Sequence, residues 1–159
     1  MNIDKKYKIE CVCSKDSTGG ILQSVYVYQE EKAWAVATNG KALAEVPVNL
    51  ENDELKKGNS IKATDLAFQR KNPAVKKQDS VFACLSPLNG TFPNFQIIWP
   101  KEPPKVTIGL NISLLKNLAD ALGSEIVKIE IIDNEKAFRV YAIDNKAKGL
   151  LMPCEIEKG

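Results

Sequence analysis

The side chains that could carry chemistry are few in this sequence. The chain contains no histidine, so it cannot build a Ser-His-Asp or Cys-His nucleophilic site or a His-ligated metal site. Adjacent carboxylates occur at residues 30–31 and 53–54. Both pairs lie in charged stretches typical of solvated turns rather than of acid-base catalysis. The sequence therefore argues against an enzyme, and we expect no cofactor.

Four cysteines are the remaining candidates for reactive or metal-binding groups. Cys11 and Cys13 form a C-x-C whose two side chains would share one face of a strand. A metal centre would need two further ligands, and Cys84 and Cys154 stand alone in the sequence. We prefer structural cysteines over the alternative of a metal site.

Phosphate-binding motifs are also missing, and the charge balance is nearly even. The chain has no G-x-G-x-x-G pattern, and Gly40-Lys41 is followed by Ala42 rather than by the hydroxyl residue of a P-loop. Among 159 residues, 22 basic side chains face 20 acidic ones, a net charge of +2. This balance excludes a protein that coats nucleic acid by bulk charge, although it allows a local basic patch.

The amino-terminal segment gives the expected location. Residues 1–8 are polar and charged, without the apolar core of a signal peptide. No stretch of the sequence approaches the roughly 20 apolar residues that span a bilayer. We therefore expect a cytoplasmic protein with no membrane partner.

The elements that must position any binding site begin with a hairpin. Residues 33–46 alternate on both sides of Asn39-Gly40, the strongest short hairpin signal. A two-residue loop would pair Thr38 with Lys41. One face of the hairpin consists of alanines, and we expect a helix to lie closely on it.

Weaker patterns predict the elements around this hairpin. Strands are expected at residues 7–13, 21–28, 60–62 and 80–85, and a helix at residues 64–71 with Thr64 as its N-cap. Residues 87–104 contain five of the eight prolines together with several large apolar side chains. They predict an extended segment that is packed down and ends in a stiff turn.

The last third has the clearest pattern. A strand at residues 105–110 precedes a helix at residues 112–122, which Asn111 would cap and Gly123 would end. The helix carries a stripe of three leucines that should be buried on the sheet: Leu115, Leu118 and Leu122. Strands follow at residues 126–132, 137–143 and 149–156. The order β-α-β-β-β predicts an antiparallel sheet with a helix on one face, an α+β fold.

Four segments carry a resemblance to a known family. They are residues 36–44 (VATNGKALA), 90–100 (GTFPNFQIIWP), 108–115 (IGLNISLL) and 149–156 (GLLMPCEI). In the same order, they resemble four conserved segments of the bacterial sliding clamp, the beta subunit of DNA polymerase III. The resemblance implies a DNA-clamp-like fold of βαβββ repeats, with antiparallel sheets and helices packed on one face.

The chain is less than half as long as a clamp protomer, which has three such domains. We predict a single condensed clamp-like domain over residues 1–159. Its halves would be residues 7–47 and 105–156, with a connecting insertion at residues 48–104. The alternative is one and a half clamp domains.

The resemblance also implies a binding site. In the family, an apolar cleft on the outer face binds short peptides of polymerases and of the clamp loader. Its positions fall here on ten residues: Thr38, Gly40, Leu43, Pro93, Ile98, Asn111, Leu114, Leu150, Met152 and Pro153. Leucine, isoleucine, methionine and proline suit an apolar peptide anchor. The alternative is that these side chains are simply part of the core.

A second implied surface would contact DNA. In the family, a ring of domains encircles duplex DNA, and its helices touch phosphates without reading sequence. The one net-basic run here supplies five candidates: Lys62, Arg70, Lys71, Lys76 and Lys77. A solvated charged face is the alternative for this run.

Two functions remain open at this point, and an enzyme of an unrecognised kind is a less favoured third. The first is a sliding-clamp-like protein with a DNA-binding, processivity or replication-associated role, which would need a homo-oligomer to close a ring. The second is a clamp-fold interaction module that binds partner proteins without encircling DNA. Expected partners are duplex DNA and peptides of the polymerase or clamp-loader type.

Overall fold

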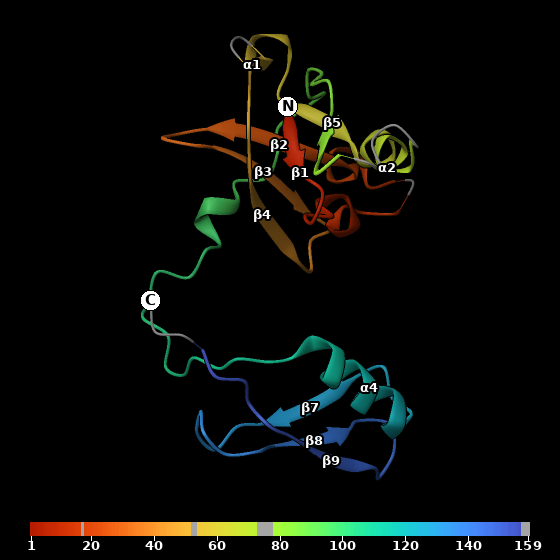
Figure 1. Ribbon diagram of the computed structural model, residues 1–159, viewed down its shortest axis with the longest axis vertical. Helices are drawn as coiled ribbons and strands as arrows, with labels where there is room; N and C mark the ends of the chain where they lie inside the picture. The colour runs from red at the N-terminus through yellow and green to blue at the C-terminus, as the bar shows by residue number, and fades with distance from the viewer. Residues whose placement is uncertain (17, 52–53, 73–77, 157–159) are drawn as a thin grey trace. The chain divides into compact units, whose positions relative to one another are not determined.

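The chain folds into two compact units, Met1–Ile98 and Trp99–Gly159 (Figure 1). A computed structural model describes residues 1–16, 18–51, 54–72 and 78–156. Residues 48–98, most of the predicted insertion, belong to the first unit. The prediction of one condensed domain stays a prediction. The predicted α+β class with antiparallel sheets is confirmed.

The first unit contains two antiparallel sheets. Four strands pair in the order β4-β3-β2-β5, and β1 pairs with β6. The strands are β1 (Asn2–Asp4), β2 (Ser24–Gln29), β3 (Ala33–Thr38), β4 (Leu43–Val48), β5 (Ser60–Lys62) and β6 (Ser80–Phe82). The helices are α1 (Glu54–Lys57), α2 (Ala63–Lys71) and three short 3-10 turns, η1 (Ile9–Val12), η2 (Gly20–Gln23) and η3 (Phe95–Ile97).

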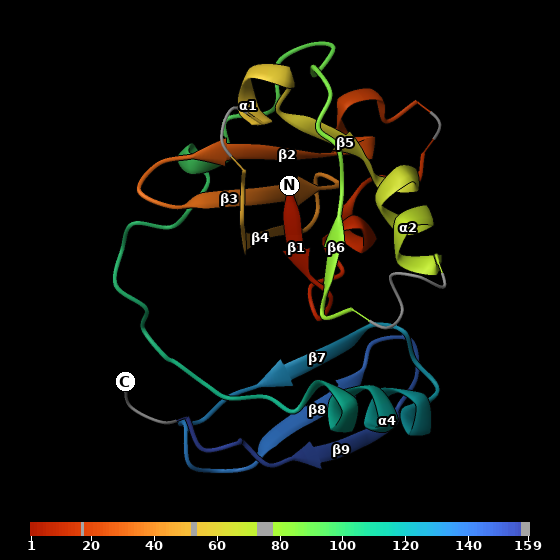
Figure 2. The same ribbon diagram turned by 45° about the horizontal axis from the view of Figure 1, so that its top comes forward.

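The core of the first unit lies on the alanine face of the larger sheet. Ala35 and Ala37 are fully buried there, beside Val25 and Val27 of the neighbouring strand. The sheet β1–β6 lies over this face (Figure 2), and Ile3 joins the same core. The predicted cover by a helix is confirmed, because η1 contacts both β3 and β4.

The segment that provides this cover is not the strand predicted for residues 7–13. Ile9–Val12 form a 3-10 helix instead. Such a helix has three residues per turn, so Ile9 and Val12 share a side, and both pack on the core. Cys11 is exposed and Cys13 is buried. The strand prediction for residues 7–13 was wrong, because Ile9 and Val12 are also spaced by three, as a 3-10 helix requires.

The hairpin forms at Asn39-Gly40, but its register differs from the prediction. Thr38 pairs with Leu43 rather than with Lys41, so the loop has four residues. The Asn39 carboxamide oxygen accepts hydrogen bonds from the backbone N–H groups of Lys41 and Ala42, both at 2.9 Å. The Asn39 side chain thus stabilises a four-residue turn in place of the predicted two-residue turn. Gly40 has the expected positive φ, +84°.

Three further elements of the first unit begin or end at other residues than predicted. The strand predicted for residues 21–28 begins only at Ser24, after a 3-10 turn, and the strand predicted for residues 80–85 ends at Phe82. Helix α2 begins at Ala63 with Lys62 at the N-cap. Thr64 is not the cap, because its hydroxyl donates to the neighbouring Asp65 carboxylate at 3.3 Å.

The second unit is a three-stranded antiparallel sheet under one helix. Its strands β7 (Val127–Glu130), β8 (Phe138–Ala142) and β9 (Lys148–Leu151) pair in chain order, and α4 (Ile112–Leu122) contacts β8 and β9. The helix bounds are those predicted. The Asn111 carboxamide oxygen accepts from two backbone N–H groups at its start, and Gly123 ends it with φ +65°.

Three details of the second unit correct the prediction. The strand predicted for residues 149–156 ends already at Leu151. Residues 105–110 form no strand but only a single bridge between Gly109 and Cys154. The leucine stripe of α4 is half-buried rather than buried. Leu118 still lies on the sheet, because a Cβ on Gly149 would come within 2.7 Å of a Leu118 methyl carbon. A three-stranded sheet is too small to bury the whole apolar face of the helix.

Gly58 gives a sharp test of the first unit. A Cβ on Gly58 would overlap the Ser86 carbonyl and lie 2.5 Å from the Pro87 nitrogen, all rigid backbone. A Cβ on Gly40 would meet nothing within 4 Å, and only its positive φ would strain it. Gly58→Ala should lower the free energy of unfolding by about 3 kcal/mol or more. Gly40→Ala should lower it by about 1–2 kcal/mol. Urea denaturation measures both, and an equal or smaller loss for Gly58→Ala would contradict this packing.

Candidate functional site: an exposed apolar surface and an aromatic pocket

The ten predicted cleft residues are divided equally between the two units. Five lie in the first unit: Thr38, Gly40, Leu43, Pro93 and Ile98. Five lie in the second: Asn111, Leu114, Leu150, Met152 and Pro153. All ten belong to the part of the chain that the structure describes, whereas their assembly into one cleft stays a prediction.

In the first unit, three of the predicted residues, Thr38, Gly40 and Leu43, lie at the turn of the hairpin. Thr38 is buried, and its hydroxyl donates to the Ala42 carbonyl at 2.7 Å while accepting from the Gly40 N–H at 3.1 Å. Leu43 is half-buried and packs against a cluster that contains Val36, Phe92 and Phe95. Thr38 therefore has a structural role in the turn, while Leu43 lies at the border of core and surface.

In the second unit, the predicted residues come from the start of α4 and the end of β9. The Asn111 side chain caps the helix and accepts from the N–H groups of Ser113 and Leu114 at 3.0 and 3.1 Å. Met152 and Pro153 follow directly after β9, and Pro153 is half-buried. Asn111 thus fixes where Leu114 projects from the first turn of the helix.

Exposure separates the two interpretations of these residues. Four large apolar members are mostly exposed: Ile98 (69%), Leu114 (52%), Leu150 (68%) and Met152 (62%). The alternative that the whole set forms the core is therefore wrong for these four. Exposed apolar side chains mark a binding site when they form one patch, and that Ile98 joins the three residues of the second unit in such a patch stays a prediction.

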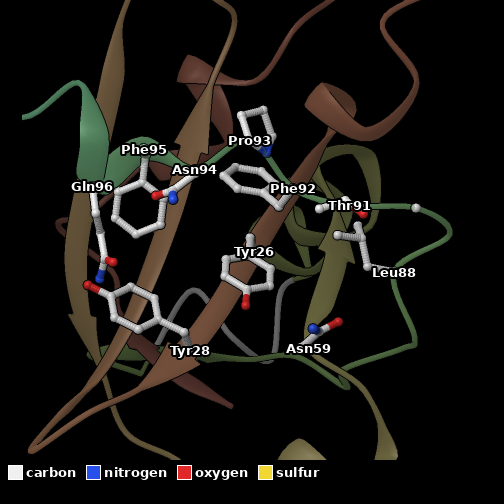
Figure 3. Close-up of a pocket in the computed structure, with 11 residues that line it drawn as sticks. Tyr26, Tyr28, Asn59, Leu88, Thr91, Phe92, Pro93, Asn94, Phe95 and Gln96 are labelled. Carbon is white, nitrogen blue, oxygen red and sulfur yellow. The ribbon is translucent and has the colours of Figure 1, made fainter.

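An aromatic pocket in the first unit was not predicted from the sequence. It lies on the face of the larger sheet opposite the alanines and has a volume of about 440 Å³. Tyr26 and Tyr28 of β2 form one wall, and the segment with Phe92 and Phe95 forms the other (Figure 3). The alternation of tyrosines with valines in residues 25–28 was the available signal, because it puts both rings on one face.

The four rings of this pocket support one another. The Tyr26 and Phe92 rings are stacked with centroids 4.9 Å apart, and the Tyr28 and Phe95 centroids are 5.5 Å apart. The Tyr28 hydroxyl donates to the Glu45 carboxylate. Burial and this hydrogen bond raise the pKa of Tyr28 above its usual range, so the hydroxyl stays a donor at neutral pH.

The side chains predicted to contact DNA are not all exposed to solvent. Lys62 and Lys71 are exposed near the two ends of α2. Lys76 and Lys77 lie outside the described residues. The Arg70 side chain is mostly buried and forms an ion pair with Glu10 at 2.5 Å. It also donates to the backbone carbonyls of Lys5 and Tyr7. Arg70 therefore ties α2 to the amino-terminal segment.

Chemistry based on metals finds little support in the part of the chain that the structure covers. No group of three or more Cys, Asp or Glu side chains there could hold a metal ion. Burial raises the pKa of the Cys13 thiol to about 12, so Cys13 stays protonated and unreactive at neutral pH. Within the same residues, no helix combines the length and apolar character that crossing a bilayer requires.

Solved structures show what this fold is similar to. The Caulobacter crescentus (C. crescentus) beta sliding clamp, solved with PEG bound, matches with a TM-score of 0.66 and 18% identity over 96% of this chain and 50% of that chain. DNA polymerase III subunit beta from Borrelia burgdorferi, solved with a natural product, matches with a TM-score of 0.59 and 18% identity, over 95% of this chain and 46% of that chain. No family model and no curated protein matches the sequence.

These matches confirm the predicted clamp-like fold. The chain spans about half the length of either clamp. At 18% sequence identity, the similarity concerns the fold alone.

Measurements of the free energy of unfolding can show whether Arg70 has a structural role rather than a role in DNA contact. Arg70→Ala would leave the Glu10 carboxylate buried without its partner, and it should lower the free energy of unfolding by about 3–5 kcal/mol. The neighbouring exposed Lys71→Ala should change it by less than about 0.5 kcal/mol. Urea denaturation followed by circular dichroism measures both. Wild-type stability of Arg70→Ala would show that the ion pair is not structural.

Proposed function

We propose that the chain is a clamp-fold binding protein that binds short apolar peptides of partner proteins at the predicted cleft residues. The observation that carries this proposal is the exposure of Ile98, Leu114, Leu150 and Met152. These are positions where the resemblance to sliding clamps puts the peptide cleft. The similarity of the fold to two beta clamps supports the same assignment.

The chemistry of the exposed residues suits such a ligand. Branched side chains at Ile98 and Leu150 offer apolar area that a leucine or phenylalanine of a peptide can cover. Met152 is flexible and polarisable, so it adapts to anchors of different shape. We expect a peptide with one or two large apolar side chains to bind in the micromolar range, about −8 kcal/mol.

Peptide binding is tested by placing a charge at Met152. In Met152→Asp, the carboxylate would stay solvated in the free protein but would be desolvated under an apolar anchor. We expect loss of binding to short peptides from replication proteins that carry one or two large apolar side chains. Fluorescence anisotropy measures the binding, and thermal melting should stay close to that of the wild type.

Ile143→Asp is the matched control, because Ile143 is 64% exposed in the same unit and is not a predicted cleft residue. It should bind the peptides as the wild type does. Unfolding of Met152→Asp would mean that Met152 belongs to the core. Absence of peptide binding by the wild type would overturn the proposal.

Duplex DNA is the second proposed partner, and the exposure of Lys62 and Lys71 supports it. Each phosphate contact adds affinity that falls with salt and reads no sequence. In the alternative, the chain is an interaction module that binds partner proteins without encircling DNA. The buried Arg70 weakens the basic surface and favours this alternative.

Charge reversal distinguishes these two functions. Combining Lys62→Glu with Lys71→Glu should weaken binding to duplexes of any sequence and reduce the salt slope by about 2. Combining Lys32→Glu with Lys41→Glu changes the net charge equally on exposed residues elsewhere, and it should have little effect. Equal effects would indicate bulk charge, and no wild-type binding at low salt would leave the interaction module as the function.

A further inference from the structure

The aromatic pocket of the first unit has features of a peptide-binding site, and it shares Pro93 with the predicted cleft. Its lining contains four aromatic rings, several amide side chains and no charged side chain. Its volume of about 440 Å³ lies in the range of ligand-binding pockets, roughly 300–1,000 Å³. Figure 3 shows the two tyrosines and the two phenylalanines on facing walls. Such a surface suits an uncharged, ring-bearing segment.

Polar groups at the pocket could hold the backbone of an extended chain. The Tyr26 hydroxyl and the side-chain amides of Asn59 and Asn94 form no hydrogen bond with another described residue. All three can donate to carbonyl oxygens of a ligand. Aromatic rings combined with such donors are the usual means of binding polyproline II segments, whose carbonyls face outward.

The rim of the pocket carries negative charge. The Gln96 amide, which lines the pocket, donates to the Glu30 carboxylate at 3.0 Å. Glu45 accepts from the hydroxyl of Tyr28, which also lines the pocket. No lysine or arginine belongs to the lining. This charge favours a ligand with basic side chains and disfavours a nucleic acid.

The chain itself contains a segment with these properties. Residues 99–105 (WPKEPPK) have proline at positions 100, 103 and 104. Three residues make one turn of polyproline II, so Pro100 and Pro103 lie on the same side. Lys101 and Lys105 outnumber the one glutamate. All seven residues are exposed in this structure, so the segment is available for contact.

We propose that the aromatic pocket of one copy binds the proline-rich segment, residues 99–105, of a second copy. The half-buried rings of Tyr26 and Tyr28, backed by the buried Phe92 and Phe95, receive Pro100 and Pro103, and the free donors bind the carbonyls between them. The lysines of the segment lie near Glu30 and Glu45. Because proline restricts the segment before binding, little conformational entropy is lost. This contact links the copies through heterologous surfaces.

A synthetic peptide of sequence WPKEPPK tests the pocket directly against the full chain. Asn94→Arg puts bulk and positive charge on the exposed wall of the pocket, and it should weaken binding at least about tenfold. Tyr26→Phe removes only the hydroxyl and should weaken it about fivefold. Gln78→Arg makes the same kind of change at an exposed residue outside the pocket and should leave binding unchanged.

The peptide also needs its prolines. A peptide with alanine at both positions 103 and 104 should bind at least about tenfold more weakly, because it loses ring contacts and polyproline II preorganisation. Met152→Asp should bind the WPKEPPK peptide as the wild type does, which separates this pocket from the proposed cleft. No binding of the peptide by the wild type, or equal binding by Asn94→Arg, would overturn the proposal.

Complementation between variants tests the second copy. Asn94→Arg has a blocked pocket but an intact segment, whereas Pro103→Ala with Pro104→Ala has the reverse. Neither should self-associate through this contact, but their mixture should form a heterodimer in sedimentation velocity experiments. Self-association of both variants alone would contradict the proposal. So would a mixture that stays monomeric while a proline-rich peptide of another protein binds the pocket.

Discussion

The strict alternation of side chains along the central strands is the constraint on which the first unit depends. Successive residues of a strand point to opposite faces, so β2 and β3 present alanines and valines on one face, and Tyr26, Tyr28 and Val36 on the other. A shift of one residue would exchange the two faces. Alanines allow the 3-10 helix Ile9–Val12 to approach closely and complete a dense core.

The opposite face is covered differently, and the candidate sites follow from that difference. The irregular segment with Phe92 and Phe95 packs against Tyr26 and Tyr28, and the four rings line an open pocket. The same segment then ends in side chains that its own unit does not bury, among them Ile98. In the second unit, one half-buried helix cannot cover every apolar side chain of a small sheet. Each unit therefore offers apolar surface to a partner.

Local interactions were predictable from the sequence, whereas distant ones were not. The helix Ile112–Leu122 was predicted with its bounds, because Asn111 and Gly123 act on their immediate neighbours. The segment of Ile9 was misassigned, since its conformation depends on the sheet that it packs against. Of the candidate site, the exposed apolar residues were predicted through the clamp resemblance. The role of Arg70 was not, because its partners lie some sixty residues earlier in the chain.

The central claim is that the predicted cleft residues bind a short apolar peptide. Backbone and methyl NMR spectra of the full chain, recorded during titration with an apolar peptide from a replication protein, test it most directly. Signals of Leu150 and Met152 should shift along one saturating binding curve, whereas the signal of Ile143, which is exposed in the same unit but outside the predicted cleft, should not shift. Absence of shifts at Leu150 and Met152, or equal shifts at Ile143, would contradict the claim.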